Sequence, residues 1–224
     1  MKQINAETSL INEFPILVKM PKDLLERLNT TAFWRRYELG EQVQNRKESC
    51  DGLMKVKSGS LRVFMQSESG KEITLYRLYK NDTCVMSASC LLNNMDVDFL
   101  IEAETETIVI LLPTTYLRNA SDSYPILKDY LNELVQQRFS QLTWVLQQVV
   151  FSSMPTRLAT YLVEMYVNIG SKNLELTHER IAADLGSARE VISRLLKYFQ
   201  EEKLVSLSRS HIELLDIDRL KQIK

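Results

Sequence analysis

The stretch from residue 126 to residue 152 contains neither glycine nor proline, and its apolar residues recur at helical spacing. This run predicts one long helix, from about 124 to 152. Apolar residues within it follow at steps of four, three, four and three, the spacing of a coiled-coil seam; they are Val135, Phe139, Leu142, Leu146 and Val149. The seam could pair with its own copy, or the helix could pack on its own β-domain.

The sequence before this helix is typical of an all-β domain. From about 32 to 112 it is rich in β-branched and aromatic residues, and turn signals such as Ser58-Gly59 and Ser69-Gly70 divide it. Several short strands at this spacing predict a β-roll or barrel, which Pro113 ends. We therefore expect an α+β chain with a β-domain over 1–123, a long helix over 124–152 and a third part over 153–224.

The third part contains THERIAADLGSAREVISRLLK, two short helical patterns separated by one glycine. Thr177 can cap the first helix, Gly186 suits the left-handed position after it, and Ser187 can start the second. The second helix has an apolar stripe at helical spacing, formed by Ala188, Val191, Ile192, Leu195, Leu196 and Phe199. Downstream, LVSLSRSHIELL predicts two strands around Ser208 to Ser210. The pattern predicts a winged helix-turn-helix.

The other face of the second helix carries side chains that can read bases. Arg189 and Arg194 can each offer a bidentate donor pair to guanine, Glu190 can accept from cytosine, and Ser193 can do either. Lys197, on the same face, is expected to touch phosphate. Two alternatives stay open: Ser187 and Glu190 could form a capping box that ties the carboxylate to its own helix, and the charged face could simply be solvated.

Charge and composition restrict the class of function. The formal net charge is −1, so any nucleic acid must be met by a local basic patch. A ligand-binding dimer that does not bind DNA is the rival, and a steep salt dependence of DNA binding would distinguish the two. No Gly-x-Ser-x-Gly, phosphate loop or complete zinc-protease motif occurs, so neither catalysis nor a metal site is expected. No segment has the length of a membrane span or the core of a signal peptide, and we expect a cytoplasmic protein without a membrane partner.

The complete pattern resembles the cyclic-AMP receptor and fumarate-nitrate-reduction regulator (Crp/Fnr) family of bacterial transcription factors. The resemblance covers nearly the whole chain, and its most specific part is LTHERIAADLGSAREVISRLLKYFQEEKLV. Members of the family show Leu-Thr, an apolar-periodic helix, Gly, and then Arg-Glu or Val-Glu followed by Arg. The resemblance implies an N-terminal double-stranded β-helix like a cyclic-nucleotide-binding domain, a dimerisation helix and a C-terminal winged helix-turn-helix.

The resemblance also implies the function and the partners. Arg189, Glu190 and Arg194 match the base-reading triplet of the cyclic-AMP receptor branch, whereas Ser193 matches the Glu-x-x-Ser-Arg pattern of the oxygen-responsive branch. The target sequence stays open between the two branches. The expected partners are an inverted-repeat DNA operator, a second copy of the chain and RNA polymerase. The residues expected at DNA are Thr177, Ser187, Arg189, Glu190, Ser193, Arg194, Lys197 and Arg209.

The sensor half departs from both branches. The segment CVMSASCLLNNMDVDF has neither the Gly-Glu nor the arginine with which relatives hold a cyclic nucleotide, so we do not expect that cofactor. No cysteine precedes Cys50, which disfavours an N-terminal iron–sulfur cluster. Both histidines lie in the DNA-binding half, which disfavours a haem with a histidine ligand.

Three cysteines remain as candidates for the signal. Cys84 and Cys90 lie where relatives bind effectors, and Cys90 follows a predicted helix start, which can favour a thiolate. Cys50 could be a resolving partner. The pair could equally be two buried cysteines that act as small hydrophobic residues, and the effector would then be an unidentified small molecule.

Overall fold

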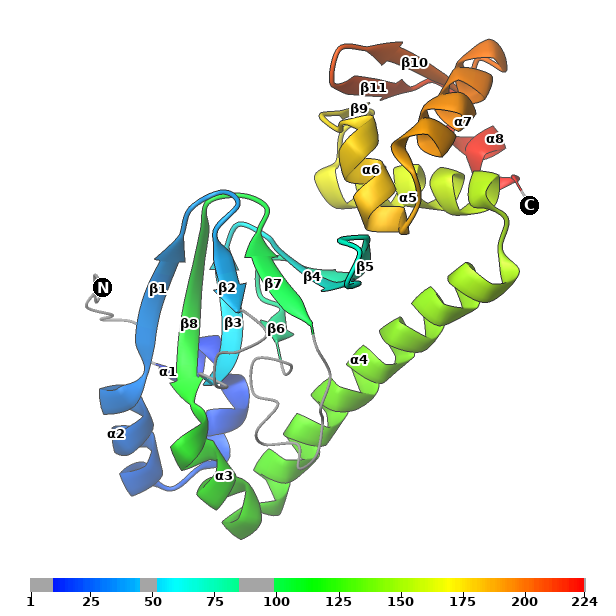
Figure 1. The fold of residues 1–224 in the computed structure, drawn as a ribbon. Coiled ribbons are helices and arrows are strands. Elements are labelled where there is room, and N and C mark those ends of the chain that lie inside the picture. The colour runs from blue at the N-terminus through cyan, green and yellow to red at the C-terminus, as the bar shows by residue number, and fades with distance from the viewer. Residues whose placement is uncertain (1–9, 45–51, 85–98, 224) are drawn as a thin grey trace. The chain divides into compact units, whose positions relative to one another are not determined.

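The computed structural model describes residues 10–44, 52–84 and 99–223, whose elements are labelled in Figure 1. Contacts divide the chain into two compact units. The first unit comprises Met1–Phe64 and Leu75–Leu142, and the second comprises Met65–Thr74 and Thr143–Lys224. In the described part of the chain, no helix combines the length and the hydropathy that crossing a membrane requires.

Eight described strands of the N-terminal half form two four-stranded sheets, with orders β1-β8-β3-β6 and β2-β7-β4-β5. The pairings of β8 with β1 and β3, of β6 with β3, and of β7 with β2 and β4 are antiparallel. The predicted β-roll is confirmed. Its strands are β1 (Phe33–Tyr37), β2 (Gln42–Gln44), β3 (Gly52–Ser58), β4 (Leu61–Gln66), β5 (Glu72–Leu78), β6 (Thr83–Cys84), β7 (Leu100–Ala103) and β8 (Thr107–Pro113).

The turn between β3 and β4 shows why the sequence has a glycine there. Gly59 has φ +84°, and a Cβ at this position would lie 2.4 Å from the carbonyl oxygen of Glu106. Both the left-handed backbone and the close approach exclude a side chain. Gly70, in the second predicted turn, also has a positive φ of +81°. Both predicted turns are therefore confirmed.

Helices precede and follow the strands. Among the described residues, three short ones come before β1: α1 (Leu10–Glu13), η1 (Pro15–Lys19) and α2 (Lys22–Thr31). After β8 comes α3 (Thr114–Ser123), which our sequence analysis did not predict. Its only described buried apolar residues are Leu117 and Ala120, too few to show helical periodicity.

The predicted long helix is α4 (Pro125–Phe151), and Pro125 occupies its first position, where the missing N–H costs no hydrogen bond. Figure 1 shows it as one continuous helix. Leu127, Leu131 and Leu134 are buried in the same hydrophobic core as the strands. One face of the helix is therefore part of the β-roll core.

The C-terminal half is a winged helix-turn-helix, as predicted. Ser153 caps its first helix by accepting a hydrogen bond from the Thr156 N–H, and left-handed Gly170 follows that helix. Its three-stranded sheet has the order β10-β11-β9. The elements are α5 (Met154–Ile169), β9 (Asn173–Leu174), α6 (His178–Leu185), α7 (Arg189–Glu201), β10 (Val205–Ser208), β11 (His211–Leu214) and α8 (Ile217–Lys221).

Candidate nucleic-acid interface

The turn between α6 and α7 is held by backbone and capping hydrogen bonds. The Thr177 hydroxyl accepts a bond of 3.1 Å from the Arg180 N–H and so caps α6, as predicted. Gly186 has the predicted left-handed conformation, with φ 63° and ψ 37°. The Ser187 N–H donates to the Ala182 carbonyl at 2.9 Å, the six-to-one bond of a Schellman cap. These bonds determine the direction in which α7 leaves the turn.

The predicted start of α7 at Ser187 was wrong by one residue. Ala188 is the N-cap, and no side-chain hydrogen bond caps the helix. The Ser187 N–H already closes the end of α6, so it cannot also bond the Glu190 carboxylate in a capping box. Ala188 is exposed because it precedes the first turn of α7, contrary to its predicted place in the apolar stripe.

The rest of the stripe holds α7 in place. Ile192, Leu196 and Phe199 are fully buried in the C-terminal core, and Leu195 packs against that core. Val191 is half-buried. This packing leaves the opposite face of α7 towards solvent.

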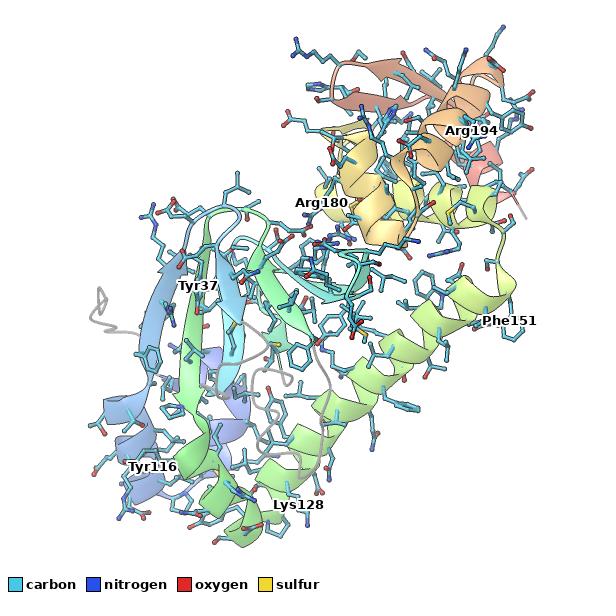
Figure 2. All side chains as sticks on the ribbon, in the orientation of Figure 1. Tyr37, Tyr116, Lys128, Phe151, Arg180 and Arg194 are labelled. Carbon is cyan, nitrogen blue, oxygen red and sulfur yellow. The ribbon has the colours of Figure 1, made fainter. Side chains whose placement is uncertain are left out.

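That face carries three cations and one carboxylate. Arg189, Glu190, Arg194 and Lys197 are all exposed, and Figure 2 shows Arg194 on α7. Arg194 donates from Nε to the Glu190 carbonyl at 3.3 Å. Its two terminal amino groups make no hydrogen bond to the described residues. They can therefore serve as a bidentate donor to an external acceptor.

Ser193 lies on the same helix but is half-buried, and a histidine holds its hydroxyl. His178 Nδ1 and Ser193 Oγ are 2.9 Å apart, so the first residue of α6 orients a predicted base-reading side chain of α7. Our sequence analysis did not select His178 for this role. Its position directly after the cap Thr177, in the chain's most specific motif, was the available signal.

Burial lowers the pKa of His178 from its usual value, and the nearby Arg189 cation lowers it further. The neutral ring is therefore favoured, and it can take either part in the bond to Ser193 according to its tautomer. Protonation would leave Nδ1 only as a donor, and Ser193 would then have to accept.

The wing has its predicted two strands, β10 and β11. Arg209 is exposed between them, and the backbone turns back through Ser210, whose φ is +58°. The His211 ring contacts the Arg209 carbonyl at 2.9 Å. Arg209 thus lies in a short hairpin turn, where a phosphate could reach it.

Of the three cysteines predicted to sense the signal, one lies within the described residues. Cys84 ends β6, pairs with Met54 of β3, and is completely buried. Cys50 and Cys90 lie outside the described residues. Within the described ranges, no group of three or more His, Cys, Asp and Glu side chains is arranged to bind a metal.

The predicted seam does not lie on a single uniform face of α4. Val135 and Leu142 are half-buried and pack against the β-roll core. Phe139, Leu146 and Val149 remain 69%, 62% and 43% exposed. The helix therefore has one face on its own core and, beside it, a second apolar face at the solvent.

Two family models match the chain. A model described as a Crp-like helix-turn-helix domain matches residues 156–223, and one described as a cyclic nucleotide-binding domain matches residues 34–124. Together they cover the β-roll and the helix-turn-helix unit described above.

Individual proteins are similar over the whole length. A solved structure from Eubacterium rectale, described as a transcriptional regulator of the Crp/Fnr family, is 37% identical with a TM-score of 0.90, and the match covers 94% of this chain and 98% of that one. The transcriptional regulatory protein btr of Bordetella pertussis is 24% identical over 98% of this chain and 93% of its own. The global nitrogen regulator of Synechococcus elongatus is 24% identical over 84% and 87%.

The lowered pKa of His178 predicts how stability depends on pH. Because the folded-state pKa lies below the unfolded value, the unfolded chain takes up the proton first. The contribution of neutral His178 to the free energy of unfolding is fully present above pH 6.5, and it is lost as the pH falls from there through the folded-state pKa. Urea unfolding of the full chain at a series of pH values should show a shallower decline for His178→Gln. The control His211→Gln, on the exposed wing, should keep the wild-type slope; equal slopes for all three proteins would contradict the assignment.

Proposed function

The chain belongs to the Crp/Fnr family of transcriptional regulators, and on that premise we propose that it acts as a homodimer on an inverted-repeat operator, under control of a signal sensed in the β-roll. One observation carries the DNA-binding part of this proposal. The buried stripe of α7 turns Arg189, Arg194 and Lys197 to solvent, and the C-cap of α6 at Gly186 closes the turn before this helix. A helix presented in this way can enter the major groove.

The base-reading roles follow from the contacts of each side chain. Arg194 can offer its terminal amino groups to a guanine edge, and Glu190, which no capping box engages, can accept from cytosine. Ser193 reads through a hydroxyl that His178 orients. We assign phosphate contacts to Thr177 at the start of α6, to Ser187 in the turn, and to Lys197 and Arg209. We propose a half-site with a TGA-like core.

The second copy is proposed to cover the exposed face of α4. Phe139, Leu146 and Val149, from the predicted seam, lie at spacings of seven and three residues along this helix, and they are 69%, 62% and 43% exposed. Large apolar side chains gathered on one face mark an interaction surface. A face that repeats at coiled-coil spacing is complementary to its own copy about a two-fold axis. The dimer would place two copies of α7 in successive major grooves about 34 Å apart.

The signal is proposed to enter at Cys84 and Cys90. Oxidation would join the two thiols in a disulfide, with two electrons passing to the oxidant and two protons to solvent. Because Cys84 is fully buried beside the core that seats α4, such a bond would favour one arrangement of the β-roll. The coupling to DNA cannot exceed that differential stabilisation. RNA polymerase is the proposed partner of the bound dimer.

The dimer proposal predicts a large effect of one charge on α4. In Leu146→Glu, each dimer loses two buried leucines, worth about 1.5–3 kcal/mol each. The dissociation constant should rise more than about 100-fold, as measured by sedimentation of the full chain. Gln137→Glu places the same charge on the other side of the helix and should leave association unchanged. A wild-type monomer at working concentration would contradict the dimer.

Base reading predicts different behaviour for two cations on α7. Arg194→Ala should weaken the free energy of binding to the operator by about 1–3 kcal/mol and that of binding to random duplex by much less. Lys197→Ala should weaken both duplexes alike and reduce the salt slope by about one. Fluorescence anisotropy with both duplexes at two salt concentrations measures this. Equal losses on both duplexes for Arg194→Ala would remove its base-reading role.

The cysteine proposal predicts an operator affinity that depends on redox conditions. The wild type should change affinity by at most about 150-fold between reductant and either an oxidant or a sulfane-sulfur donor. Cys84→Ser and Cys90→Ser should each abolish the response while still binding the operator. If all three proteins bind alike in every condition, the cysteines are packing residues.

A further inference from the structure

One side-chain contact joins the two helices of the helix-turn-helix. His178 is the first residue of α6, Ser193 lies in the second turn of α7, and the His178 Nδ1 and Ser193 Oγ atoms are 2.9 Å apart. Both side chains are half-buried, so the contact is partly shielded from water. The Ser193 hydroxyl makes no other hydrogen bond to the described residues. The state of the His178 ring therefore decides what this hydroxyl can offer to a partner outside the chain.

In the neutral state the hydroxyl donates to the ring. A serine hydroxyl has one proton to donate, and a neutral imidazole has one nitrogen that carries a proton and one that accepts. Within the described part of the chain, His178 Nδ1 is the one acceptor that the Ser193 proton reaches, and Nε2 makes no hydrogen bond and can carry the ring proton. Only the lone pairs of Ser193 then remain for an external partner. Ser193 is an acceptor in this state.

Protonation of the ring reverses the contact. An imidazolium carries a proton on both nitrogens and accepts nothing, so Nδ1 must donate and the Ser193 oxygen must accept. The hydroxyl proton of Ser193 is released from the ring and becomes available to an external acceptor. One proton on His178 therefore changes Ser193 from an acceptor to a donor.

The charged groups near His178 determine the pH at which this change occurs. Burial lowers the pKa of His178, and the cation of Arg189 on α7 lowers it further. The negative phosphates of bound DNA act in the opposite direction and raise this pKa. The other charged side chains near the start of α6 have partners or lie in solvent: Glu175 is near His211, Arg180 is near Asp184, and Glu179 is exposed.

The hydroxyl lies in the middle of the face that we assign to DNA. Position 193 is one helical turn from each of two exposed cations, Arg189 and Lys197. A duplex that contacts both cations also covers the hydroxyl between them. Ser193 is thus placed to meet a base edge, and His178 contacts it from α6.

We propose that His178 is a positioning residue that sets which base Ser193 reads, so that the operator preference changes when the ring is protonated. This inference rests on the proposed function, because it assigns a form of regulation to the base-reading face of α7. In the major groove, the exocyclic group of adenine or cytosine donates, whereas that of guanine or thymine accepts. Neutral His178 therefore selects adenine or cytosine at the base that Ser193 contacts, and protonated His178 selects guanine or thymine.

The base that Ser193 contacts is identified first. An operator is selected by the full chain from random inverted repeats, and each base pair of its half-site is changed to the other three. The duplexes are bound to the wild type and to Ser193→Ala, and fluorescence anisotropy gives the affinities. The Ser193 position is the base pair that the wild type discriminates and Ser193→Ala does not. If Ser193→Ala discriminates every base pair as the wild type does, Ser193 reads no base and the inference is overturned.

The pH dependence then tests His178. At the Ser193 position, the affinity for adenine is divided by that for guanine, or the affinity for cytosine by that for thymine, from about pH 8 to about pH 5. This ratio cancels any general gain in DNA affinity from added positive charge. We expect it to fall about 2- to 12-fold as the pH falls, the worth of one hydrogen bond. The midpoint should match the pKa of His178 in the wild-type complex, measured by NMR. A ratio that stays constant over this range overturns the proposal.

Variants identify the group that takes up the proton. His178→Asn places an amide near the position of Nδ1 but cannot titrate, so its ratio should not change with pH. His211→Asn removes the other histidine of the chain, on the exposed wing, and should keep the wild-type pH dependence. A ratio that still changes with pH in His178→Asn would assign the proton to another group. If His178→Asn does not fold, the match between the NMR pKa and the midpoint in the wild type decides.

The same duplexes separate this inference from the proposed function. A wild-type chain that binds an inverted repeat with a ratio independent of pH would overturn the role of His178 and leave the regulator proposal standing. A chain that prefers no inverted repeat over random duplex at any pH would contradict the proposed function itself.

Discussion

The seating of α4 on the β-roll is the contact on which the rest of the N-terminal unit depends. Leu127, Leu131 and Leu134 bury one face of the helix in the strand core, and each leucine contributes about 1.5–3 kcal/mol when it leaves water. The helix cannot turn about its axis without exposing these side chains. The packing places the neighbouring α4 residues of the first unit, including the exposed Phe139 and the buried Arg138.

A polar residue in that packed face has a different consequence from an apolar one. A leucine at position 138 could pack in the core, but it could not donate a hydrogen bond to the Thr83 carbonyl as the guanidinium does. The guanidinium instead ties α4 to the end of β6 by a directional bond of 2.8 Å to the Thr83 carbonyl, and it places a positive charge in the core. Arg138 lies over the Tyr76 ring, and the buried Cys84 is near enough to Tyr76 to raise its pKa further.

The DNA-binding unit follows a different principle, in which backbone bonds do most of the positioning. Gly186 and the bond from the Ser187 N–H to the Ala182 carbonyl form the turn between α6 and α7 without any side chain of the recognition face. The polar face is then open to variation without loss of the fold. The bond between His178 and Ser193 is an exception, since it links the recognition face to the preceding helix.

The sequence by itself determined the features that act over a few residues. Caps, left-handed glycines and apolar spacing depend on neighbours within one or two turns, and so the turns at Gly59 and Gly186, the long helix and the winged helix-turn-helix were all predictable. Only the tertiary structure decided which side chains meet across the chain. Thr83 and Arg138 are 55 residues apart, and Ser193 and His178 are 15 apart. Such contacts depend on how whole elements pack, so local spacing could assign seam residues to α4 but could not show that Arg138 would be buried against the Thr83 carbonyl.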